Sequence, residues 1–190
     1  MDNYSLTLSA APTDEPLSLN EVKLHLRLTN SDYDDELIPL ITEARKYIEE
    51  HTGYRLITQT WVLTMDELEE CIKLPYPPLQ SISSIKYQDI NNVQQTLSSN
   101  YYTVDNKTIP ARVNQAYSYI YPPTYPELNV VAITFICGYG NTAETVPNAF
   151  KRAIKMYIQW VFDNDSNAKA ILDNFILQNK INWFCGDISD

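Results

Sequence analysis

Hydrophobic residues recur at helical spacing in the first third of the chain. Over residues 33–52, one face of the expected helix carries Leu37, Leu40, Ile41, Ala44, Tyr47, Ile48 and His51. This stripe predicts an amphipathic helix, and Gly53 suits the left-handed conformation that commonly follows a helix. Pro39 interrupts the pattern, so the helix either begins close to this proline or is kinked there.

A second, shorter helix is expected upstream over residues 19–28. The alternation of leucines at its end would also fit a strand. Ser18 and Glu21 decide in favour of a helix, because they have the spacing of a capping box, in which each side chain hydrogen-bonds to the backbone of the other residue.

From Leu56 the period of the hydrophobic pattern changes to two. Short β-branched or aromatic runs alternate with clusters of Pro, Asn, Ser and Asp, which is typical of a small antiparallel sheet. The runs are 58–64, 71–74, 82–88, 101–104, 111–114 and 130–137. We therefore expect a β-rich insertion over residues 56–137, with residues 89–92 as a hairpin turn.

Helical spacing returns near Pro147, a residue that is well tolerated in the first turn of a helix. The pattern predicts a helix over 147–162 whose polar stripe is narrow. A helix that is apolar on most sides has to be buried on most sides, so we expect it to face neighbouring subunits as well as the core. The candidate residues of such an oligomer interface are Phe150, Ile154, Tyr157, Ile158, Trp160 and Val161.

Together these elements predict an α+β, mainly helical fold. We expect a small bundle of about four helices, with the antiparallel β-rich insertion between the second and third helix. The length of 190 residues suits one domain, which we place at 1–164. Residues 165–190 would then form a C-terminal helix, over about 168–178, and a tail.

Composition narrows the possible partners and the compartment. The formal net charge of −10 argues against tight binding of duplex nucleic acid, because affinity for phosphates comes from clustered Lys and Arg. Cys71, Cys137 and Cys185 are widely spaced and odd in number, so we expect a reducing compartment, with neither a disulfide nor a zinc site. The apolar run 130–137 is far shorter than the roughly 20 residues of a membrane helix.

Two groups of residues suggest chemistry only weakly. The acidic run 32–36 could be a metal site or a pair of catalytic carboxylates, but acidic groups are also favoured at a helix N-terminus. Cys137 with His25 or His51 could form a nucleophile and base, although a cysteine at the end of a strand is commonly a small buried hydrophobe. We therefore predict no catalytic residue, no metal site and no cofactor.

Residues 117–126 place four tyrosines between prolines. Rigid amphipathic aromatic side chains are favoured in protein interfaces and on sugar-binding surfaces. The candidate contact residues are Tyr117, Tyr119, Tyr121 and Tyr125. A protein contact, a glycan contact and a loop that simply folds over the sheet all remain open.

Short motifs follow one another in order between residues 16 and 164. They are Pro16-Leu-Ser-Leu-Asn-Glu-Val-Lys-Leu-His-Leu-Arg27, Asp34-Asp-Glu-Leu-Ile38, Ala44-Arg-Lys-Tyr-Ile48, Thr52-Gly53, Leu56-Ile-Thr-Gln-Thr-Trp61, Leu74-Pro-Tyr-Pro-Pro-Leu-Gln-Ser-Ile82, Val104-Asp105, Pro110-Ala-Arg112, Gly138-Tyr-Gly140 and Val146-Pro147. Their order resembles that of the head-tail connector, or adaptor, proteins of long-tailed phages and prophages.

The resemblance implies a ring, usually a dodecamer, that docks beneath the portal and extends the DNA channel in the virion neck. The implied partners are the portal protein, a downstream neck, head-closure or tail-completion protein, and further copies of the chain. DNA would pass without sequence-specific binding, which the acidic balance suits. Assembly would take place in the host cytoplasm, with no membrane, cofactor or catalysis involved. Three aromatic residues of the C-terminal segment then become candidates for portal docking: Phe175, Trp183 and Phe184.

Two other function classes remain as hypotheses. One is a non-catalytic binding module that uses the 117–126 loop to hold a glycan or a host protein. The other is an enzyme that depends on Cys137 or His51.

Overall fold

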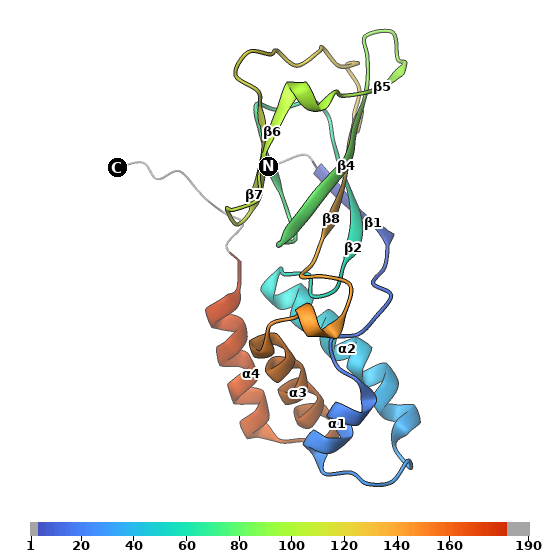
Figure 1. Cartoon of the computed structure of the whole chain (residues 1–190), viewed down its shortest axis with the longest axis vertical. Helices are drawn as coiled ribbons and strands as arrows, with labels where there is room; N and C mark the ends of the chain where they lie inside the picture. The colour runs from blue at the N-terminus through green and yellow to red at the C-terminus, as the bar shows by residue number, and fades with distance from the viewer. Residues whose placement is uncertain (1–3, 182–190) are drawn as a thin grey trace, which may run out of the picture. The chain divides into compact units, whose positions relative to one another are not determined.

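The computed structural model describes residues 4–181 (Figure 1). Its helices account for 35% and its strands for 28%, with the strands in two antiparallel sheets. The expectation of a mainly helical fold is therefore wrong, and the fold is α+β with nearly equal shares. The reason is that the strands are more numerous than the sequence pattern indicated, and one of them lies before the first helix.

The chain forms two compact units. The β unit consists of Met1–Ala11 and Thr58–Gly138, and the helical unit of Pro12–Ile57 and Tyr139–Asp190. None of the three junctions between the units lies at residue 164, and the last helix packs against the preceding one inside the helical unit. The expected division into 1–164 and 165–190 stays a prediction.

The helical unit contains the four α-helices of the described residues. They are α1 (Leu19–Leu26), α2 (Asp34–Thr52), α3 (Asn148–Asp163) and α4 (Ser166–Asn179). Their ends differ from the expected ranges by at most two residues. Helix α2 begins before Pro39 and continues through it, and Gly53 ends the helix with a positive φ of 86°.

The capping box that decided between helix and strand for α1 is present. The backbone N–H of Glu21 donates to the Ser18 hydroxyl, and the backbone N–H of Ser18 donates to the Glu21 carboxylate at 2.9 Å. The hydrogen bond from the Ser18 backbone is the main cause that lowers the pKa of Glu21. Arg27 then ends the helix in the left-handed conformation.

We expect Ser18→Ala to lower the free energy of unfolding by about 1 kcal/mol, because the start of α1 loses a cap. The loss should be largest above the ordinary pKa of Glu21, because the Ser18 hydroxyl also donates to the Glu21 carboxylate at 2.8 Å and helps to lower its pKa. The backbone hydrogen bond from residue 18 remains in the variant, so only this side-chain part of the pH dependence is lost. A carboxylate with a lowered pKa in the folded state stabilises the fold there and loses this contribution as the pH falls through that pKa. Urea unfolding at neutral and acidic pH measures both effects, and Ser31→Ala, in the exposed loop before α2, is the control. An equal loss at both pH values would contradict this prediction.

The core of the helical unit draws residues from all four helices. Its members include Val22, Leu37, Ala44, Ile48, Phe150, Ile154, Ile158 and Leu172. Helix α3 contacts each of the other three helices, so it occupies the middle of this unit.

The β unit contains two antiparallel sheets. The larger sheet has the order β1 (Tyr4–Ala10), β2 (Gln59–Met65), β8 (Val131–Cys137), β4 (Leu79–Gln88) and β5 (Gln94–Thr96). The smaller sheet has the order β3 (Cys71–Leu74), β7 (Ala111–Gln115) and β6 (Tyr102–Asp105). Strand β1, which the sequence pattern did not indicate, pairs with β2.

The central strand β8 shows why the period-two pattern was informative. Its residues alternate between buried and half-buried, and the buried positions are Val131, Ile133, Phe135 and Cys137. The expected turn between β4 and β5 also forms, because the Asp89 carboxylate accepts hydrogen bonds from the backbone N–H groups of Asn91 and Val93.

Candidate interaction surfaces

Most of the side chains proposed for an oligomer interface lie in the core of the helical unit. Phe150, Ile154, Tyr157 and Ile158 are each no more than 6% exposed. Their burial among neighbouring helices explains why α3 is apolar on most sides. A side chain enclosed in its own subunit has little surface left for a neighbour, so the interface role of these four residues stays a prediction that their burial does not favour.

The two remaining residues of that set lie towards the end of α3. Trp160 is half-buried and packs edge-on against Tyr157, with ring centroids 5.6 Å apart. Val161 is 45% exposed. A role of these two side chains in oligomer contacts therefore stays a prediction.

Tyr157 is the one residue of the set that combines burial with a polar contact. Its hydroxyl donates to a carboxylate oxygen of Glu43 at 2.6 Å. Burial, and then this hydrogen bond to Glu43, raise the pKa of Tyr157. The hydroxyl therefore stays protonated at neutral pH and links α2 to α3.

The structure places one of the three residues proposed for portal docking. Phe175 is half-buried on α4, where its ring packs edge-on against Phe150 at a centroid distance of 5.4 Å. Trp183 and Phe184 lie outside the described residues. The docking role of all three stays a prediction.

The tyrosine loop is attached to the sheet at several points. Tyr119 packs against Tyr101 with ring centroids 5.1 Å apart, and Tyr121 and Tyr125 pack against the core of the β unit. The backbone N–H of Tyr125 donates to the carbonyl of Gln88 at 2.9 Å. Tyr117, by contrast, is fully exposed.

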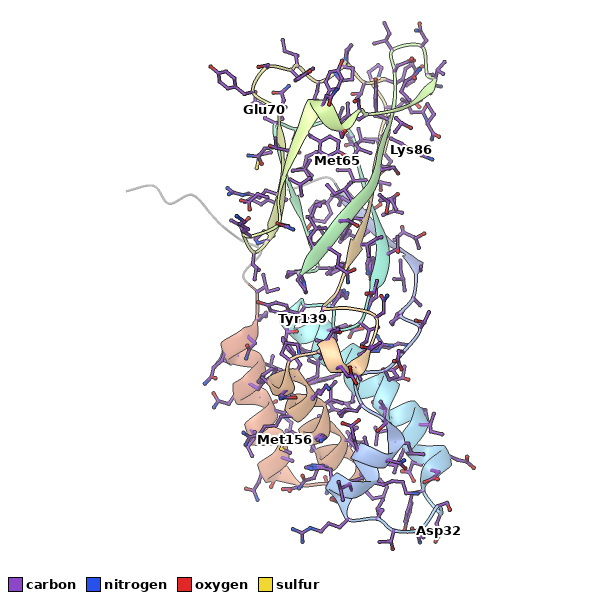
Figure 2. All side chains as sticks on the ribbon, viewed as in Figure 1. Asp32, Met65, Glu70, Lys86, Tyr139 and Met156 are labelled. Atoms are coloured by element: carbon purple, nitrogen blue, oxygen red, sulfur yellow. The ribbon has the colours of Figure 1, made fainter. Side chains whose placement is uncertain are left out.

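The exposed residues beside this loop are apolar and acidic. Apolar side chains that are more than half exposed include Ile90, Val93, Ile120 and Leu128. A shallow groove of about 570 Å³ is lined by Asp66, Glu67, Thr124, Tyr125, Pro126, Glu127 and Leu128. Figure 2 shows Met65, Glu70 and Lys86 at this same end of the β unit. We call the surface around this groove, with the acidic residues Asp66, Glu67 and Glu127, the acidic end of the β unit.

The residues considered for catalysis have other contacts. The Cys137 thiol is fully buried and lies 3.8 Å from the carbonyl oxygen of Gln59. The ring of His51 stacks on Tyr47, and its Nδ1 lies 2.8 Å from the Tyr47 carbonyl oxygen of its own helix. Over residues 4–181 there is no group of three or more His, Cys, Asp or Glu side chains placed to hold a metal ion.

The family is decided by a sequence comparison. The model of the family described as "Phage gp6-like head-tail connector protein" matches residues 16–121 of this chain, which is more than half of it. The chain belongs to this family. The match confirms the resemblance that the order of the motifs indicated, and it makes the protein a member of a family of structural phage proteins.

Solved structures of gene transfer agent (GTA) particles share the connector's fold. The chain in "Neck of native GTA particle computed with C12 symmetry" is 18% identical, with a TM-score of 0.76 over 96% of this chain and 98% of that chain. "Neck of empty GTA particle computed with C6 symmetry" gives a TM-score of 0.74 at 18% identity, also over 96% and 98% of the two chains. "Virion of native gene transfer agent (GTA) particle" gives 0.73 at 18% identity, over 95% and 98%. No curated protein matches the sequence.

None of the described helices of the connector is long and apolar enough to cross a membrane. The surfaces that sequence reasoning missed are the acidic end of the β unit and the side of α3 on which Lys151, Arg152 and Lys155 line a surface groove. Both depend on exposure, and the sequence pattern does not reveal which residues of a loop or helix the neighbouring elements leave uncovered.

Proposed function

We propose that this connector forms a ring in the virion neck, beneath the portal, where it extends the DNA channel and joins the capsid to the tail. The observation that carries the proposal is its membership of the head-tail connector family. The similar fold of chains in GTA necks, whose structures were computed with C12 and C6 symmetry, supports a ring and a dodecamer in particular.

The proposed partners are the portal protein, a downstream neck, head-closure or tail-completion protein, and further copies of the chain. DNA would pass through the ring without being gripped, because a wall with net negative charge repels phosphates. The net charge of −10 is in keeping with this role. We place assembly in the host cytoplasm and infer neither a cofactor nor an enzymatic activity.

The alternative of a glycan-binding or host-binding loop gains no support from the loop geometry. Of its four tyrosines, three pack against other side chains of the β unit, and Tyr117 alone is fully exposed. A row of exposed aromatic faces, which a sugar platform requires, does not form.

Negative-stain electron microscopy of the chain mixed with the portal protein of the same phage tests the proposal. We expect an added ring of density on one face of the portal and co-elution of the two proteins in size-exclusion chromatography. Portal alone and connector alone are the controls. A portal whose images and elution do not change in the presence of excess connector would contradict the proposed function.

The same mixture tests the tail residues. If Trp183 and Phe184 dock to the portal, the double variant Trp183→Ala, Phe184→Ala should lose co-elution while it keeps the helical content of the wild type. Binding equal to that of the wild type would reject the docking role of these two residues.

A further inference from the structure

The outward face of α3 is flanked by two grooves. The groove between α3 and α4, of about 330 Å³, is mainly apolar and includes Ala149, Ala153, Met156, Ile171 and Phe175. The groove between α1 and α3, of about 380 Å³, includes His25, Lys151 and Lys155. Arg152 and Met156 line both grooves, so the two form one surface, which we call the α3 face.

The α3 face is basic in an acidic chain. The sequence has 24 acidic and 14 basic residues, and three of the basic ones lie here, on one side of a single helix. No ion pair joins Lys151, Arg152 or Lys155 to a carboxylate among residues 4–181. Glu21 also lines this groove, and its carboxylate accepts hydrogen bonds from Ser18 and interacts electrostatically with Lys151 and Lys155. Since none of the three cations is held in an ion pair, an external anionic group can still approach them.

The helical unit also carries a surface of opposite charge. Around the start of α2, Asp32, Asp35 and Glu36 are exposed. Beside them, Tyr33 is 43% and Ile38 is 55% exposed. Figure 2 shows Asp32 and Met156 well separated within the helical unit. The two surfaces therefore do not meet inside one subunit.

We propose that the α3 face binds the start of α2 of a second copy of the chain. Ile38 would enter the apolar groove beside Met156, and Asp35 and Glu36 would approach Lys151 and Lys155. This inference rests on the proposed ring. A contact between two different surfaces of identical subunits is heterologous, and it closes into a ring when the same rotation repeats. Charge complementarity sets the orientation of such a contact.

The proposal changes the role of α3 in assembly. Four of the six residues expected at the interface are buried in the core, whereas the narrow polar stripe carries the charges for a neighbour. The exposed Ile38 and the half-buried Met156 supply the apolar part of the contact.

Cross-linking of variants that carry one introduced surface cysteine, beside the fully buried Cys137, tests the contact directly. In a background with Cys71→Ser and Cys185→Ser, the Lys155→Cys variant is mixed with the Glu36→Cys variant and treated with a short bismaleimide. We expect a covalent dimer in the mixture and little in either variant alone. The matched control replaces Glu36→Cys by Glu50→Cys, an exposed position at the other end of the same helix, and should give little dimer. Equal yields from the two mixtures would overturn the inference.

Charge reversal provides a second test. Restored association in the combined variant could not result from misfolding of the first one. We expect Lys151→Glu with Lys155→Glu to weaken self-association by on the order of tenfold, because like charges then face each other. Combination with Asp35→Lys and Glu36→Lys should restore association. Sedimentation velocity at low and high salt measures self-association. Failure of the combined variant to regain it would overturn the inference.

The possible outcomes separate this inference from the proposed function. Rings on the portal without the selective cross-link would leave the connector role intact and reject this contact. Absence of portal binding would reject the connector role, and the cross-link in concentrated solution would still decide the contact.

The chain's own tail is the competing occupant of the α3 face. A cross-link that forms only after residues 182–190 are deleted would reject a second copy's α2 as the occupant in favour of the tail, whereas a selective cross-link that forms with these residues present supports the inference.

Discussion

Replacement of Ile154 by alanine lowers the free energy of unfolding by about 2–5 kcal/mol, because the shortened side chain leaves a cavity in a packed core. Ile154 is fully buried in the middle helix of the helical unit. Urea unfolding followed by far-ultraviolet circular dichroism measures the loss. The loss should not depend on protein concentration, since the contacts that disappear lie within one subunit.

Val161→Ala on the same helix is the matched control. Val161 is 45% exposed, and a surface substitution of this kind changes stability by about 0.5 kcal/mol or less. An Ile154→Ala variant with the stability of the wild type but without the ability to form rings would show that Ile154 belongs to the oligomer interface after all.

Removal of the Arg45 side chain is expected to cost about 3–5 kcal/mol, because it takes a buried cation away from the two carboxylates with which it pairs. Arg45 is buried between two acidic residues. Its Nε lies 2.7 Å from Glu15, and its Nη1 lies 3.0 Å from Glu49. Thermal unfolding of Arg45→Ala, compared with the wild type at the same pH, measures the loss.

The contacts of this cluster explain why removal of Arg45 should lower the free energy of unfolding by more than the loss of one ion pair would. Glu49 also accepts a hydrogen bond from the backbone N–H of Leu56 at 2.8 Å. Glu15 and Leu56 lie in the segments by which the chain enters and leaves the helical unit. Arg45 and Glu49 on α2 therefore hold both segments in place.

Lys169→Ala is the control for Arg45→Ala. Lys169 forms an exposed pair with Asp173 one turn later on α4, at 2.6 Å. Exposed pairs of this kind stabilise a helix by about 0.5 kcal/mol or less. Losses of similar size for the two variants would contradict the special role of the Arg45 cluster.

Local sequence was sufficient where a residue acts through its own neighbours. Ser18 and Glu21 form the expected capping box, and the turn at Asp89 forms where the polar cluster indicated it. The alternation along β8 predicted its buried face. Local signals failed for β1, because its residues are mostly exposed and it is held by pairing with β2, at least 50 residues away in the sequence.

By itself the sequence determined the positions of the four helices, most of the strands and, through the order of its motifs, the head-tail connector family. The tertiary structure decided which face of each element is covered. Ile154 and Lys155 are adjacent in the sequence, yet the first is buried in the core and the second lines a groove on the surface. The physical reason is that burial depends on the packing of elements distant in the chain. Only the assembled helices show that α3 turns its apolar side to the core and leaves its basic side at the surface.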